Sequence, residues 1–162
     1  MRLPEALAER LRFLSQVVRK ECVHLTDTDQ RLFMQALTEQ QLVLISTDPI
    51  LAERLDAFVC RFGRLQDTVG DKMLPALLTA LEESPGAAID NLDKAEKFGL
   101  ITSADQWVEM RRLRNQMVHE YIEDLTVLSS ALRTGHLFVP DLVSAARRCV
   151  DETDRVLGLH QR

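Results

Sequence analysis

Apolar residues recur at intervals of three and four positions along most of this 162-residue chain, and this spacing places them on one face of a helix. The chain has only five prolines and six glycines, few runs of β-branched residues, and many residues that favour helices. We therefore expect an all-α fold. The first helix should span residues 4–25, where the apolar spacing is clearest: Leu7, Leu11, Leu14, Val18, Cys22 and Leu25.

Start signals predict two further helices in the first half of the chain. The polar run 26–29 has the composition of a helix N-cap and predicts a second helix over residues 32–45. Asp48 followed by Pro49 predicts the start of a third helix, because proline is tolerated in a first helical turn. We expect this third helix to bend within residues 70–75, where glycine and proline interrupt the pattern.

Similar signals divide the second half. A shorter helix over residues 87–98 should stop at Gly99, because glycine favours the residue that follows a helix. Ser103 should cap the next helix, and the last helix should begin after Pro140.

Length and composition fit one globular domain, in which we distinguish an N-terminal helix, residues 1–25, from the remaining helical part, residues 26–162. The three cysteines, Cys22, Cys60 and Cys149, are far apart and lie in apolar helical patterns. This pattern is typical of reduced core cysteines in a cytoplasmic protein and not of a zinc site. The start of the chain lacks an apolar leader, and no window approaches 18 consecutive apolar residues, so we expect no membrane insertion.

The formal charge of −5 argues against a protein that coats nucleic acid, because non-specific binding depends on many cations facing phosphates. We expect no DNA partner. Contact with RNA would have to be local, and the densest basic cluster is formed by Arg111, Arg112 and Arg114.

The most chemically varied stretch is residues 114–121, Arg-Asn-Gln-Met-Val-His-Glu-Tyr. At 100° per residue, Arg114 and Tyr121 are about 20° apart on a helix, and Asn115 and His119 are about 40° apart. Arginine offers a planar donor fork for phosphate, and histidine exchanges protons near neutral pH. The strip therefore predicts a site for phosphodiester chemistry that needs neither metal nor cofactor.

Solvation is the simpler interpretation of such a strip, since polar residues normally cover the outer face of a helix. The third helix has a similar polar side that carries Arg64, Asp67 and Asp71, and it too is typical of a solvated face with local ion pairs. The functional alternative is that these residues support the site, with Asp67 or Asp71 turned towards His119 or Arg114.

The residues Phe98-Gly99-Leu100-Ile101, Trp107-Val108-Glu109-Met110, Arg114-Asn115 and His119-Glu120-Tyr121 resemble the HEPN fold. The resemblance is to the small HEPN proteins that are paired with minimal nucleotidyltransferases in toxin–antitoxin modules, and it covers about residues 30–158. It implies an up-and-down helical bundle that dimerises, with Arg114 and His119 in a ribonuclease site and Asn115 beside them. It also implies that the partner nucleotidyltransferase adenylylates Tyr121 and thereby silences the toxin.

Chemistry independently favours a homodimer. Metal-free RNA cleavage needs a base for the 2′-hydroxyl, an acid for the leaving oxygen and a cation for the phosphate, whereas one chain offers one motif histidine. A two-fold interface would supply the second histidine. Two other hypotheses stay open: a non-catalytic adaptor that presents substrate to the nucleotidyltransferase, and a purely structural helical bundle.

Overall fold

The computed structural model describes residues 2–158, without the side chains of residues 120–123. Within this range the regular structure is entirely helical, as the apolar spacing predicted, and it contains no strand. In chain order the elements are α1 (Glu5–Leu32), α2 (Glu39–Leu42), the 3-10 turn η1 (Val43–Ser46), α3 (Pro49–Asp67), the π-helical segment η2 (Thr68–Met73), α4 (Leu74–Ala80), α5 (Ala88–Lys97), α6 (Ala104–Glu123) and α7 (Leu125–Val156).

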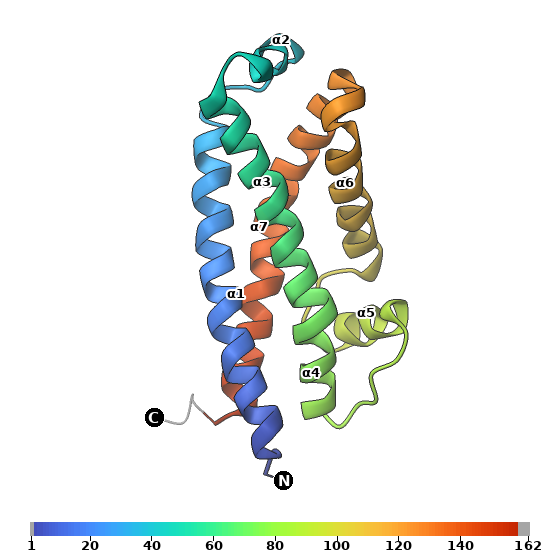
Figure 1. Ribbon diagram of the computed structural model, residues 1–162. Helices are drawn as coiled ribbons and strands as arrows, with labels where there is room; N and C mark the ends of the chain where they lie inside the picture. The colour runs from blue at the N-terminus through green and yellow to red at the C-terminus, as the bar shows by residue number, and fades with distance from the viewer. Residues whose placement is uncertain (1, 159–162) are drawn as a thin grey trace.

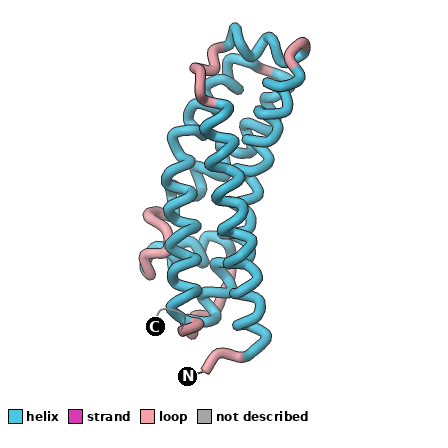
Figure 2. Tube along the Cα trace, turned by 90° about the vertical axis from the view of Figure 1, so that its left-hand side faces the viewer, coloured by secondary structure: helices cyan, strands magenta, loops and turns pink. Residues whose placement is uncertain are grey.

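The long helices alternate in direction and form an elongated bundle (Figures 1 and 2). The chain ascends along α1, returns through α3, η2 and α4, ascends again along α6 and returns along α7, so the start of α1 and the end of α7 lie at the same end of the bundle (Figure 1). α1 packs against α3 and α7, and α6 packs against α7 and α3. The short helix α5 connects α4 to α6. This arrangement confirms an all-α bundle.

The helix boundary predicted at residues 26–29 is wrong, because α1 continues to Leu32. Thr28 and Asp29 do not cap a new helix: both are buried and contact neighbouring helices. The hydroxyl of Thr28 accepts a hydrogen bond from Arg61 on α3, and Asp29 Oδ1 lies 2.7 Å from His136 Nδ1 on α7. Polar residues that resemble a cap therefore join α1 to the rest of the bundle.

His136, the partner of Asp29, also packs against the end of α1. His136 lies in the middle of α7, and its ring stacks on Phe33 with 4.2 Å between the ring centroids. Burial raises the pKa of its partner Asp29, and the hydrogen bond and charge of His136 only partly oppose that shift. The pair fixes the last turn of α1 against α7.

The predicted second helix is largely replaced by loop and short turns. Only residues 39–46 are helical there, as α2 followed by η1, and Thr38 and Gln41 form a reciprocal capping box at the start of α2. The start of α3 is as predicted: Asp48 Oδ1 accepts hydrogen bonds from the backbone N–H groups of Ile50 and Leu51, both at 3.1 Å. Within residues 70–75, where we expected a bend, the chain stays helical: the π-helical segment η2 (Thr68–Met73) leads directly into α4.

Local signals also located the boundaries of α5 and α6. The chain after α5 adopts a left-handed conformation at Gly99, with φ of 72°. Ser103 Oγ accepts a hydrogen bond from the N–H of Gln106 at 3.2 Å, as a cap should.

The predicted start of the last helix after Pro140 is wrong. α7 begins at Leu125, where Asp124 caps the N–H groups of Thr126 and Val127, and it contains Pro140. An apolar face runs through the proline, since Val139 and Leu142 are buried on either side while Pro140 itself is exposed. Burial of that face holds the helix together despite one missing backbone hydrogen bond.

Two of the three cysteines lie in the core as predicted, and burial raises the pKa of the Cys22 thiol to about 11 and that of Cys149 to about 12. The prediction was wrong for Cys60, which is exposed on α3. None of the helices in the described range has a stretch long and apolar enough to cross a membrane.

Candidate functional site

The candidate strip, residues 114–121, lies on α6. The inner face of this helix is formed by Trp107, Met110, Leu113 and Met117, all buried against the bundle core. Their spacing of three and four residues leaves Arg114 half-buried and leaves Asn115 and His119 exposed. The side chain of Tyr121 lies outside the described part of the structure.

Arg114 reaches across from α6 to α3. Its Nη2 atom lies 3.1 Å from Asp67 Oδ2, with 33% of the arginine side chain and 40% of the aspartate side chain exposed. On the way it passes over Gly63, where an added Cβ atom would lie 2.8 Å from Arg114 Nε. The absence of a side chain at position 63 thus makes room for the arginine.

A second ion pair joins α6 to η2, about one turn away from the first. Because α6 runs antiparallel to α3 and η2, its arginine comes earlier in the chain and its aspartate comes later. Arg111 Nη2 lies 2.9 Å from Asp71 Oδ1. Of the two carboxylates considered as supports for the site, Asp67 therefore contacts Arg114, whereas Asp71 contacts Arg111. Neither carboxylate has a hydrogen bond or ion pair with His119 among the contacts of the described residues.

A groove of about 610 Å³ runs between α3, η2 and α6, and Arg114 lies along it. Its lining contains three basic and two acidic side chains beside an apolar wall: Arg64, Lys72 and Arg114, Asp56 and Asp67, and Val59, Cys60, Thr68, Met117 and Val118. Val118 has 51% of its surface exposed, so the apolar interruption noted in the strip faces this groove. The groove combines positive charge with apolar surface.

A carboxylate that sequence reasoning missed lies behind this lining. The hydroxyl of Thr68 donates a hydrogen bond to Glu21 Oε1 at 3.0 Å, and the other oxygen, Oε2, is buried without a partner among the described residues. Burial raises the pKa of Glu21, and the Thr68 hydrogen bond and nearby Arg64 and Lys72 oppose the shift. The signal was present in the sequence, because Glu21 lies three residues after Val18 and four before Leu25 on the apolar side of α1.

The structure brings only some of the candidate residues together. Arg114, Arg64 and Asp67 line the groove, whereas Asn115 and His119 are exposed on α6 and are not part of its lining. Within the described residues, no group of three or more His, Cys, Asp or Glu side chains is arranged to hold a metal ion. One chain thus offers a groove lined by three basic and two acidic side chains, with His119 outside it.

Comparison of the chain with protein-family models, with curated proteins and with solved structures gave no match in any of the three.

Proposed function

We propose that this protein is a metal-independent ribonuclease whose active site forms when two copies bring their 114–121 segments together. The observation that carries the proposal is the placement of Arg114, which is oriented by Asp67, passes over Gly63 and lies along a groove with further cations. An arginine held in one geometry can bind phosphate through its planar fork. His119, on the same helix, supplies the group that exchanges protons.

The two-fold dimer follows from the chemistry of the cleavage. One histidine accepts the proton of the 2′-hydroxyl group, the second protonates the leaving 5′-oxygen, and Arg114 stabilises the charge of the pentavalent phosphate. His119 is exposed and lies outside the groove of its own chain, so it is free to act on RNA held against a second copy. Asn115, exposed one residue after Arg114, would orient the phosphate.

A cognate minimal nucleotidyltransferase would neutralise this activity by modifying Tyr121, in accordance with the resemblance to HEPN toxins. A nucleotide attached there would add negative charge on the helix that carries Arg114, and it would therefore repel and obstruct RNA. Intact-mass and peptide analysis after co-expression tests this step: the added mass should locate to Tyr121 and disappear in Tyr121→Phe. Full neutralisation with an unmodified Tyr121 would contradict it.

The alternative function is a non-catalytic adaptor that binds the nucleotidyltransferase and presents its substrate. It is favoured by the ion pair that already occupies Arg114 and by the position of His119 outside the groove. The two functions differ in their need for a proton carrier, because an adaptor would tolerate replacement of His119.

The deciding experiment measures cleavage of single-stranded RNA by the purified full-length chain, its variants His119→Ala and Arg114→Ala, and the control Arg31→Ala. Arg31 lies on α1, is 63% exposed, forms an ion pair with Asp27 and is not part of the groove lining. Loss of the proton carrier or of the cation should lower the rate about 10²- to 10⁴-fold, while Arg31→Ala and treatment with EDTA leave it unchanged. A pure protein that cleaves no RNA, or an active His119→Ala variant, would favour the adaptor.

The oligomeric state is tested separately by sedimentation. The proposal requires a dimer at the concentrations at which RNA is cleaved. Mixing His119→Ala with wild-type protein should lower the specific activity by more than simple dilution, because mixed dimers lack one of the two proton carriers. A monomer with full activity would contradict the shared site.

A further inference from the structure

We propose that the groove between α3, η2 and α6 is a subsite for one nucleotide of the RNA, next to the bond that is cleaved. Arg64 and Lys72 would bind its phosphate, and the apolar wall would pack against its base. This inference rests on the proposed function, because it assigns the substrate contacts of the same site.

The cations of the groove support binding of an anion. On this side of the molecule Arg111 and Arg114 have aspartate partners, whereas no ion pair is formed by Arg64 or Lys72 within the described residues. Arg64 Nη2 donates a hydrogen bond to the sulfur of Cys60 at 3.3 Å, and the charges of Arg64 and Lys72 act on the buried Glu21 without forming an ion pair among the described residues. Both side chains are exposed and can turn towards a phosphate in the groove.

The apolar part of the lining suits a nucleobase. Val59 on α3 and the exposed Val118 on α6 give the groove an apolar surface, whereas Met117, which also lines it, is buried. Proteins recognise single-stranded RNA largely through unstacked bases that stack on aromatic rings or on arginine guanidinium planes, and the lining offers the guanidinium groups of Arg64 and Arg114. The volume of about 610 Å³ is in the range of pockets that enclose ligands of this size.

The backbone of η2 is a second indication of function. Thr68 and Lys72 both line the groove and both belong to this π-helical segment, a conformation that is rare in helices and common at functional sites. Arg114 lines the same groove from α6. A nucleotide in the groove would therefore place a neighbouring phosphate close to Arg114.

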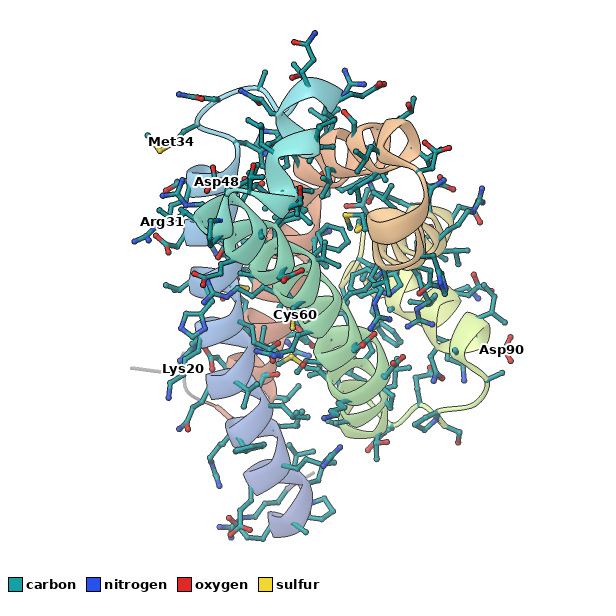
Figure 3. The ribbon with its side chains drawn as sticks, turned by 45° about the horizontal axis from the view of Figure 1, so that its top comes forward. Lys20, Arg31, Met34, Asp48, Cys60 and Asp90 are labelled. Carbon is teal, nitrogen blue, oxygen red and sulfur yellow. The ribbon has the colours of Figure 1, made fainter. Side chains whose placement is uncertain are left out.

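Cys60 provides a built-in probe of occupancy. It lies in the groove about midway along α3 (Figure 3), whereas Cys22 and Cys149 are buried. The rate of alkylation by iodoacetamide, followed by peptide mass analysis, therefore has two uses. At Cys60 it reports whether the groove is occupied, and at Cys22 and Cys149 it reports whether the whole protein unfolds. The RNA probe is a short 2′-O-methylated oligoribonucleotide, which cannot be cleaved because it lacks the attacking hydroxyl.

Saturating probe should slow alkylation of Cys60 and leave Cys22 and Cys149 unreactive. At the probe concentration that just saturates the wild type, Lys72→Gln should weaken that protection because the variant binds the probe less tightly, and Lys72→Gln and Arg64→Gln should each lower the slope of log Kd against log salt by about one. Lys20→Gln is the matched control, since Lys20 projects from α1 on the side away from α3 (Figure 3) and should change neither quantity.

The outcomes separate this inference from the proposed function. Protection of Cys60 that depends on Lys72, in a protein that cleaves no RNA, would support the nucleotide subsite and contradict the ribonuclease. Cleavage that depends on His119, with an unchanged Cys60 rate at saturating probe and unchanged salt slopes in both variants, would overturn the subsite and leave the ribonuclease intact.

Discussion

Arg114 on α6 lies across Gly63 on α3, so closely that a Cβ atom at position 63 would be 2.8 Å from Arg114 Nε. The glycine lets the guanidinium group reach Asp67, one turn further along α3. A residue without a side chain therefore decides where the main cation of the candidate site points.

Gly63→Ala should displace Arg114 without unfolding the protein. Alanine stabilises a helix interior by about 1 kcal/mol relative to glycine. This gain offsets part of the cost of the close contact between the new Cβ atom and Arg114. Misplacing a catalytic group by about 1 Å can lower the rate 100-fold, so we expect a loss of kcat/KM up to that size for RNA. Gly86→Ala is the control, because a Cβ there would meet no atom within 4 Å. Equal activity of the two variants would show that the position of Arg114 is unimportant.

The variant Asp67→Asn tests whether Asp67 acts by orienting Arg114 or by changing the charge around it. The pair is partly exposed, so its loss should cost less than about 1 kcal/mol of stability. The amide can still accept one hydrogen bond but no longer forms an ion pair, so it leaves more positive charge for the phosphate and holds the guanidinium group less firmly, and kcat should fall while KM does not rise. Asp71→Asn removes the same charge from Arg111 and should leave kcat close to that of the wild type. Steady-state kinetics of both variants would contradict a positioning role for Asp67 if their kcat values coincided.

Glu21→Gln should stabilise the protein at neutral pH and not in acid. Because burial raises the pKa of Glu21 above 4.5 in the folded state, the folded protein binds the proton more tightly than the unfolded chain. Its contribution to stability is therefore largest below about pH 4.5 and is lost as the pH rises through the raised pKa. Glutamine stays neutral and can still accept the hydrogen bond from Thr68.

Melting temperatures at pH 4 and pH 7 test this prediction. The advantage of Glu21→Gln over wild type should appear only at pH 7, and Glu9→Gln, an exposed glutamate on the same helix, should show no such difference. A variant less stable than wild type at pH 7 would mean that the charge of Glu21 stabilises the fold through Arg64 and Lys72.

Gly70→Ala should disturb the packing of Trp107 on η2. A Cβ at position 70 would lie 3.0 Å from Trp107 Nε1, and the indole is only 1% exposed, so it has little room to move. Overpacking of this kind costs about 1 to 3 kcal/mol, more than the gain in helix propensity. Trp107 is the single tryptophan of the chain, so a red shift of its emission with a lower melting temperature would report the change. Unchanged fluorescence would mean that η2 adjusts instead.

Interactions within a few residues were predictable from the sequence. The caps at Asp48 and Ser103 and the turn at Gly99 all depend on neighbouring positions, and the structure has each of them. Local chemistry of this kind acts in the same way in any fold.

Predictions failed where a residue had a distant partner. Thr28 and Asp29 look like a helix start, but Arg61 and His136 bind them from other helices and keep α1 continuous. Pro140 looks like a helix start too, but burial of the apolar residues on both sides of it outweighs the missing hydrogen bond.

By itself the sequence determined the all-helical class and the presence of Arg114, Asn115 and His119 on one helix, because helical periodicity is a property of neighbouring residues. Only the tertiary structure decided that Arg114 pairs with Asp67, that Cys60 is exposed in a groove, and that Glu21 is buried behind Thr68. These relationships depend on how α6 and α1 pack against α3 and η2. Each joins residues separated by dozens of positions, which local periodicity does not constrain.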